Sequence, residues 1–96
     1  MRFDGRTEKR AMMAFPVCLV AAENLPAEPA MTVNVSLHGA RVVTSRRWQP
    51  EEQPRLASRS GTFRTPAEVV YCEPLNDGHF CVGLKLQSAF LSWKAI

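Results

Sequence analysis

Short β-branched segments separated by turn residues are the feature that most constrains the fold of this chain. Residues 31–37, 40–45 and 80–86 each have the length of a single strand, and proline, glycine or asparagine lies between such runs. This spacing is typical of all-β domains. The chain has 96 residues, 46% of them hydrophobic, which is enough for one small core. We therefore expect a single compact all-β domain and no second folded unit.

Six strands and one short helix are predicted. The strands are expected at residues 15–21, 31–37, 40–45, 55–59, 67–72 and 80–86. Residues 24–30 and 46–54 contain prolines and are predicted to be loops, the second one solvated. The last two strands form a hairpin through Asn76, Asp77 and Gly78, which tolerate positive φ.

The six strands are expected to close into an antiparallel barrel, because closure removes unpaired strand edges. Residues 88–96 can begin a helix at the Ser88 cap and place Trp93 and Ile96 on one face. Such a short helix needs to dock on the sheet, and we expect it to cover one open end of the barrel. Residues 1–10 are then a flexible N-terminal arm, and residues 11–96 form the barrel domain.

The cysteine and histidine positions predict neither a metal site nor a redox motif. The three cysteines show no Cys-x-x-Cys pair, and His38 and His79 are isolated. Cys72 and Cys81 lie on the two strands of the predicted hairpin, so a cross-strand disulfide is the alternative to three reduced thiols. We expect reduced thiols in a cytoplasmic protein.

Targeting, membrane insertion and catalysis are disfavoured by the sequence. Residues 11–22 imitate a secretory signal, but acidic residues precede them, Pro16 interrupts them, and the barrel needs their strand. No apolar run is long enough to cross a bilayer as a helix. Paired carboxylates, a Cys-His-Asn set and a phosphate loop with lysine are all missing, so we do not expect an enzyme.

Residues 31–39 carry a polar pattern on an apolar strand. Strand alternation places Val33, Val35 and Leu37 on one face and Asn34 and Ser36 on the other. The apolar face is expected to line the barrel interior, so that Asn34 and Ser36 are displayed together on the outside.

Gly39 follows directly and begins the turn into the next strand. Positive φ in that turn is one role for this glycine, and the lack of a side chain also lets a purine lie against the backbone. His38 is interpreted as a turn residue.

Arginine dominates the positive charge of the chain and occurs in a suggestive place. Nine arginines and three lysines give a formal net charge of +3, and guanidiniums suit bidentate recognition of phosphates and purine edges. Arg-x-x-x-Arg occurs three times, so the string alone decides nothing. Arg6 and Arg10 stand next to the first strand, where an arm can fold across a neighbouring strand end, whereas Arg55 and Arg59 lie within a strand.

These elements together resemble the PilZ domain, the bacterial receptor module for cyclic di-GMP. The pattern comprises Arg-x-x-x-Arg at residues 6–10, Asn-x-Ser-x-x-Gly at residues 34–39 and a late strand Val-Gly-Leu-Lys-Leu at residues 82–86. The resemblance covers nearly the whole chain. It implies a six-stranded β-barrel with a C-terminal helix, and a binding module with no catalysis and no cofactor of its own.

Carried over position by position, the resemblance implies a ligand site for cyclic di-GMP. Arg6 and Arg10 would take the phosphates and guanine edges, and Asn34, Ser36 and Gly39 the guanine and backbone side. Asn34 stands where many members of the family have aspartate. Because a neutral amide cannot make the charge-assisted bonds of a carboxylate, weaker binding is expected.

Three functions remain open from the sequence. The first is a receptor that binds cyclic di-GMP and transmits the signal to a protein partner. The second is a PilZ-fold adaptor without ligand binding, in motility or secretion machinery. The third is a small basic barrel that binds single-stranded nucleic acid, which needs exposed aromatic residues for stacking. Phe63, Tyr71 and Trp48 are the candidates for that role. We expect no membrane partner.

Overall fold

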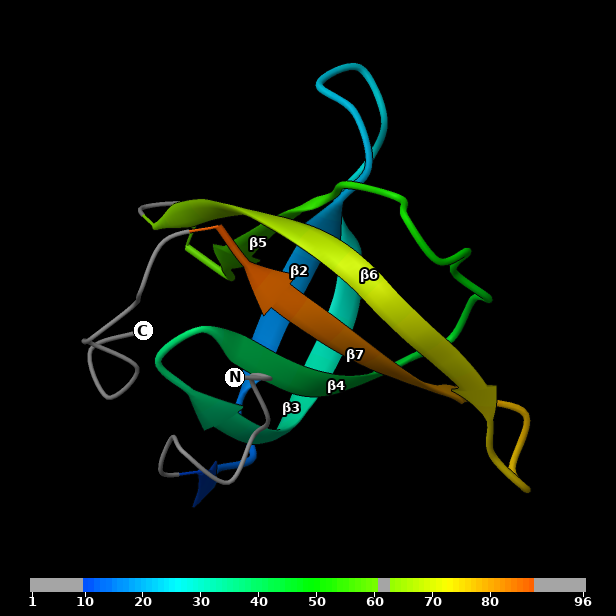
Figure 1. The fold of residues 1–96 in the computed structure, drawn as a ribbon. Helices are drawn as coiled ribbons and strands as arrows, with labels where there is room; N and C mark the ends of the chain where they lie inside the picture. The colour runs from blue at the N-terminus through cyan, green and yellow to red at the C-terminus, as the bar shows by residue number, and fades with distance from the viewer. Residues whose placement is uncertain (1–9, 61–62, 88–96) are drawn as a thin grey trace.

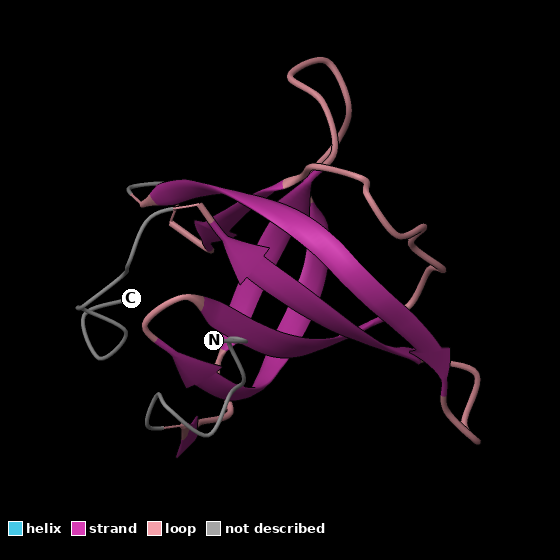
Figure 2. Cartoon of the chain, in the orientation of Figure 1, coloured by secondary structure: helices cyan, strands magenta, loops and turns pink. Residues whose placement is uncertain are grey.

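The computed structural model describes residues 10–60 and 63–87, and every regular element in this part of the chain is a β-strand (Figure 1, Figure 2). The strands are β1 (Ala11–Met12), β2 (Pro16–Val20), β3 (Glu28–Ser36), β4 (Gly39–Thr44), β5 (Arg55–Ser58), β6 (Arg64–Pro74) and β7 (Phe80–Leu86). All pairs are antiparallel. The strand order is β1-β3-β2-β5-β6-β7-β4, and a further pairing of β3 with β4 closes the sheet.

Closure makes a six-stranded barrel from β2 to β7, with β1 as one extra strand. β1 pairs with the last part of β3 and β2 with its first part. The predicted antiparallel barrel is confirmed. The predicted helix over residues 88–96 lies outside the described residues, as does the predicted arm except for Arg10. Within the described ranges, no helix could cross a membrane.

Prolines near strand ends account for two boundaries that differ from the prediction. β3 begins within the predicted loop 24–30, and β6 begins before the predicted strand 67–72. Pro29 lies just outside the part of β3 that pairs with β4, and Pro66 just outside the part of β6 that pairs with β7. A proline has no N–H for the ladder and is tolerated where one strand edge is open. Both strands therefore extend through a proline that the sequence suggested as a breaker.

The predicted turn at residues 76–78 joins β6 to β7. Gly78 has a φ of 91°, in the left-handed region that favours glycine. The Asp77 carboxylate accepts a hydrogen bond of 3.0 Å from the backbone N–H of His79. Glycine and aspartate thus fix a tight connection, and the predicted hairpin is confirmed.

The core consists of the inward-facing side chains of the barrel strands together with Trp48. Its largest fully buried apolar members are Trp48, Leu19, Leu56, Leu86, Val17, Val42, Val69 and Val82. Trp48 is only 1% exposed, so the prediction of a solvated loop over residues 46–54 is wrong at this position. The strands leave space at one end of the barrel, and the indole fills it. Because it is buried, Trp48 is not available as a stacking surface for nucleic acid.

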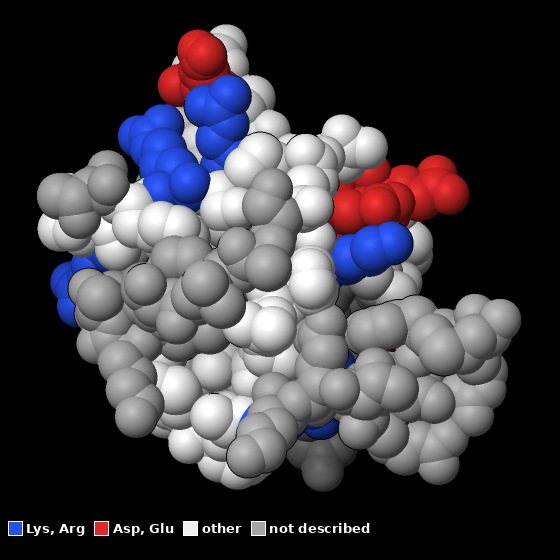
Figure 3. All heavy atoms as spheres, turned by 60° about the vertical axis from the view of Figure 1, so that its left-hand side comes forward, with Lys and Arg blue, Asp and Glu red and all other residues white. Residues whose placement is uncertain are grey.

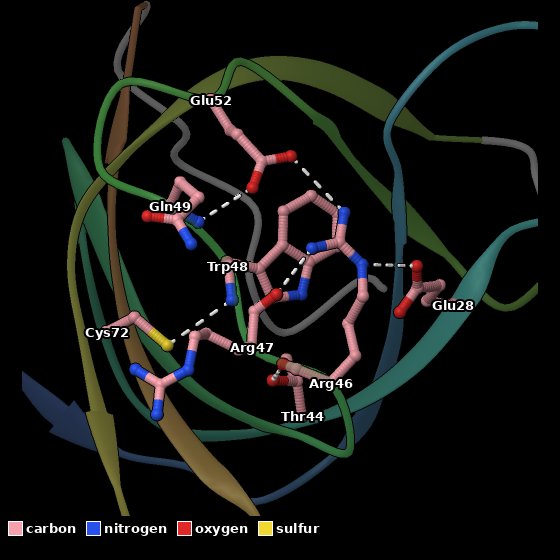
Figure 4. Close-up of polar contacts among 8 residues, drawn as sticks. All are labelled: Glu28, Thr44, Arg46, Arg47, Trp48, Gln49, Glu52 and Cys72. Atoms are coloured by element: carbon pink, nitrogen blue, oxygen red, sulfur yellow. Dashed lines mark hydrogen bonds and ion pairs between the residues drawn. The ribbon is translucent and has the colours of Figure 1, made fainter.

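Arg46 covers the indole of Trp48 (Figure 4). Its guanidinium carbon lies 3.5 Å from the ring centroid. Nε donates to Glu28 at 2.7 Å and Nη2 to Glu52 at 3.2 Å. The carboxylate of Glu52 also accepts the backbone N–H of Gln49 at 2.7 Å. This cluster of Glu28, Arg46, Trp48, Gln49 and Glu52, called the end cluster below, closes that end of the barrel.

Cys72 and Cys81 lie on opposite faces of the β6–β7 hairpin. Cys72 pairs with Val82, a core residue, whereas Cys81 pairs with Glu73. Side chains on paired positions share a face, so Cys72 points inward and Cys81 outward. The Cys72 sulfur accepts the backbone N–H of Trp48 at 3.4 Å. The three cysteines are free thiols.

Candidate functional site

A β-bulge decides which side chains of β3 face outward. The register of β3 against β4 shifts between Thr32 and Asn34, which leaves Val33 as the inserted residue. Thr32 before the bulge and Val35 after it are 1% and 2% exposed and both point into the barrel. Asn34 therefore lies on the outer face, opposite Arg41 of β4. Bulges commonly redirect side chains next to functional sites.

Asn34 and Ser36 lie on the outer face as predicted, but they are covered. Their exposed fractions are only 6% and 5%. The prediction that Val33 and Leu37 fill the interior together with Val35 is wrong. Val33 is only partly buried at the bulge, and Leu37 is 41% exposed because it lies in the turn beyond β3. Of the three, Val35 alone is part of the core.

Arg10 covers Asn34 from the segment before β1. Its Nη1 donates a hydrogen bond of 2.9 Å to Oδ1 of Asn34, which joins residues 24 positions apart. β1 holds Arg10 in place, since Ala11 pairs with Val35. Arg6 lies outside the described residues. The structure thus brings together one residue from each of the two sequence motifs.

Ser36 and Gly39 face each other across the β3–β4 turn. The Ser36 hydroxyl donates a long hydrogen bond of 3.5 Å to the carbonyl of Gly39. Gly39 does not adopt a left-handed φ, so the proposed turn geometry does not explain the glycine. A Cβ at this position would lie 3.1 Å from the carbonyl oxygen of Leu84. A side chain at this position would therefore be tightly packed against the backbone of β7. The backbone carbonyl of the turn residue His38 accepts a hydrogen bond of 2.8 Å from the backbone N–H of Leu86.

A cleft of about 620 Å³ lies beside these residues on the outer face of the barrel. β4, β6 and β7 supply most of its wall. Its lining residues are Arg10, Ser36, His38, Gly39, Ala40, Arg41, Val70, Tyr71, Gly83, Leu84, Lys85, Leu86 and Gln87. The volume is in the range of pockets that hold a drug-sized ligand. Three of the predicted site residues therefore line the cleft, and Asn34 adjoins it through Arg10.

The cleft is positively charged. Arg10, Arg41 and Lys85 line it, and no Asp or Glu is among the described lining residues. Nε of Arg41 donates a hydrogen bond of 2.7 Å to the hydroxyl of Tyr71. This hydrogen bond raises the pKa of the Arg41 guanidinium above its ordinary value. The arrangement suits a ligand that carries phosphates, because guanidiniums bind planar oxyanions through paired N–H donors.

Comparison with protein families also bears on the type of ligand that the cleft suits. A family model for the PilZ domain matches residues 4–89. The chain belongs to the PilZ domain family. PilZ domains in general bind cyclic di-GMP. None of the curated proteins compared with the chain matches it.

Arg41 and Tyr71 are cleft residues of this PilZ domain that the sequence motifs did not reveal. Arg41 lies two residues after Gly39 in the chain. Its position opposite Asn34 depends on how β3 pairs with β4, so the sequence alone gave little indication of it. Tyr71 comes from a distant strand, 30 positions from Arg41. Pairing of β6 with β7 brings Tyr71 beside Gly83 and so into the cleft.

A second cleft of about 540 Å³ lies at another part of the PilZ domain. The loop between β2 and β3 projects over it, and Arg55 and Arg64 line it together with Glu23. Figure 3 shows Lys and Arg side chains gathered below this projecting loop, with an acidic side chain on the loop above them. None of the predicted site residues lines it. Across the described residues, no three potential ligands cluster to hold a metal ion.

Proposed function

We propose that this PilZ domain is a receptor for cyclic di-GMP that binds the ligand in the cleft beside Arg10 and transmits the signal to a protein partner. The observation that carries the proposal is the hydrogen bond between Arg10 and Asn34. It joins the arginine motif to the Asn-x-Ser-x-x-Gly motif at the edge of a positively charged cleft. Family membership supports the choice of ligand.

The chemistry of the ligand fits the groups present. Guanine offers O6 and N7 acceptors on one edge, which suit an arginine fork, and N–H donors on the other, which suit a side-chain oxygen. In the proposal Arg10 and Arg6 bind phosphates and guanine edges. Asn34 supplies the oxygen, Ser36 binds a phosphate or braces the turn, and Gly39 leaves the backbone open to the base.

Isothermal titration calorimetry with cyclic di-GMP tests the proposal. We expect saturable binding by the wild-type chain and a loss of about tenfold or more in Arg10→Ala, because a hydrogen bond to a charged group contributes about 1.5–3 kcal/mol. Asn34→Ala loses a neutral contact and is expected to weaken binding by about two- to tenfold. Arg55→Ala is the matched control, since it removes an exposed arginine outside this cleft.

Two results would overturn the proposal. The first is the absence of saturable binding by the folded wild-type chain, which would favour the adaptor function without ligand. The second is equal affinity of Arg10→Ala, Asn34→Ala and Arg55→Ala. Guanosine monophosphate serves as a comparison ligand. Equal affinity for it would show that the cleft recognises a single nucleotide rather than the cyclic dinucleotide.

A further inference from the structure

One row of outward-facing positions crosses four neighbouring strands of the cleft wall. Asn34 of β3 pairs with Arg41 of β4, Arg41 with Gly83 of β7, and Gly83 with Tyr71 of β6. Neighbouring strands lie about 5 Å apart, so the four positions form a continuous band on the outer face.

Two β-bulges build the ends of this row. The bulge at Val33 turns Asn34 outward, as described above. A second register shift between Val69 and Tyr71 leaves Val70 as the inserted residue of β6. Val69 is 1% exposed and points inward, so regular alternation would have turned Tyr71 into the barrel as well. Each bulge therefore brings the residue that follows it onto the same outward band.

The middle of the row holds the Arg41 side chain in one orientation. The ring of Tyr71 lies against Gly83, where a Cβ would come within 2.1 Å of the ring. The absence of a side chain at Gly83 thus lets the ring lie flat on β7. The Tyr71 hydroxyl then accepts Nε of Arg41 at 2.7 Å. Arg41 is directed along the row, away from Asn34.

The terminal nitrogens of Arg41 remain available. In the described part of the chain they have no acceptor, the hydroxyl that holds Nε is neutral, and the Glu73 carboxylate attracts the guanidinium without forming a salt bridge to it. A carboxylate partner would neutralise it. An arginine that is oriented by a hydrogen bond, has no salt bridge among the described residues and lines a cleft is suited to receive an oxyanion.

We propose that Arg41, positioned by Tyr71, is a further ligand-binding arginine of this cleft and contacts a phosphate of the bound nucleotide. The inference rests on the proposed function and extends it. Cyclic di-GMP carries two phosphates, and Arg10 with Asn34 occupies only one end of the row. Arg41 supplies a separate cation about one strand spacing from Asn34. Tyr71 acts through Arg41 as a positioning residue.

Calorimetry with cyclic di-GMP on four variants tests this assignment. Arg41→Gln removes the charge but retains N–H donors, and we expect about tenfold weaker binding. Arg41→Lys keeps a charge without the planar fork and should fall between Arg41→Gln and wild type. Tyr71→Phe keeps the ring on Gly83 and removes the hydroxyl, for which about two- to fivefold weaker binding is expected. Arg55→Gln is the matched control and should bind like wild type.

Two further measurements separate ligand contact from a structural effect. The melting temperatures of the ligand-free variants should stay close to that of wild type, because the Arg41–Tyr71 hydrogen bond is exposed to solvent. The affinity difference between wild type and Arg41→Gln should shrink at high ionic strength, since salt screens the attraction to phosphate.

The outcomes distinguish this inference from the proposed function. If wild type binds, Arg10→Ala does not, and Arg41→Gln matches Arg55→Gln, the receptor function stands and the role of Arg41 is rejected. If Tyr71→Phe binds like wild type while Arg41→Gln is impaired, Arg41 contacts the ligand without help from Tyr71, and the positioning role fails. If wild type itself does not bind, the receptor function fails and the role of Arg41 with it.

Discussion

Arg46 and Arg41 are both held by hydrogen bonds on Nε, yet their partners differ in charge. Arg46, in the end cluster, donates to the carboxylates of Glu28 and Glu52. Arg41, in the cleft, donates to the neutral hydroxyl of Tyr71. The first guanidinium is neutralised within the protein. The second has no salt bridge among the described residues, and its terminal nitrogens have no hydrogen-bond acceptor there.

We interpret this difference as a division between a structural region and the proposed recognition region. Like Arg41, Arg10 donates its hydrogen bond to a neutral group, the side-chain amide of Asn34. The end cluster instead covers the buried Trp48 and joins the 46–54 loop to the start of β3. We therefore expect substitutions in the end cluster to change the free energy of unfolding, and substitutions of the cleft arginines to change mainly ligand affinity.

The largest effect is expected for Trp48→Ala. Removing a fully buried indole leaves a cavity in a small core, and such truncations cost about 3–5 kcal/mol. Urea-induced unfolding, followed by circular dichroism, measures the loss. It should appear as a much lower midpoint, or as a chain that is unfolded without denaturant.

Trp48→Phe is the matched control for that variant. Phenylalanine keeps most of the apolar ring and removes the indole Nε1, which is buried without a hydrogen-bond partner among the described residues. Leaving such a donor unpaired costs about 1–3 kcal/mol, so the loss in Trp48→Phe should be much smaller than in Trp48→Ala. Equal losses in the two variants would contradict the role of Trp48 as an apolar plug. Weaker ligand binding by folded Trp48→Phe would break the separation between the two regions.

Gly83→Ala is expected to have the next largest effect, and it acts on the cleft. The added Cβ would lie 2.1 Å from the Tyr71 ring, so the ring has to leave β7. We expect about 1–3 kcal/mol of destabilisation from overpacking, as measured by urea-induced unfolding. Weaker binding of cyclic di-GMP is also expected, because the displaced ring no longer holds Arg41.

A double-mutant cycle with Tyr71→Ala tests this explanation. Once the ring is gone, Gly83→Ala should cost little, so the two substitutions should be strongly non-additive in the free energy of unfolding. Additive costs would show that glycine is required at position 83 by the backbone of β7 and not by the position of the Tyr71 ring.

The strands and the closed barrel were predictable from alternation and turn residues. β7 has the predicted bounds, and the turn before it depends on Gly78 as expected. Alternation failed at Val33, which a bulge leaves only partly buried, and a second bulge at Val70 interrupts the alternation of β6. A bulge results from how two strands pair, and neither strand alone carries a clear signal for it.

The candidate site was predictable where its residues form local motifs. Arg10, Asn34, Ser36 and Gly39 were found from order and spacing along the chain. Tyr71 was missed as a cleft residue because only the pairing of β4, β7 and β6 brings it beside Arg41. The burial of Trp48 was missed for a similar reason. Space at the end of a barrel is a property of the closed sheet and leaves no local pattern in the sequence.

The smallest effect concerns acid stability of the end cluster. Burial raises the pKa of Glu52, but the Gln49 N–H and the Arg46 guanidinium lower it more, so that it lies below its ordinary value of 4.5. A carboxylate whose pKa is lowered by folding stabilises the folded state at pH values above its ordinary pKa. That stabilisation is lost as the pH falls through the folded-state pKa. Because the Glu52 side chain is 31% exposed, Glu52→Gln should cost less than about 1 kcal/mol near neutral pH. Urea unfolding at about pH 7 and about pH 3 should show this difference shrink in acid, because wild-type Glu52 loses its charge as the pH falls through its lowered folded-state pKa. Glu23→Gln, on the projecting loop, is the control and should match wild type at both values. A deficit of Glu52→Gln that persists in acid would assign the role of Glu52 to packing and not to charge.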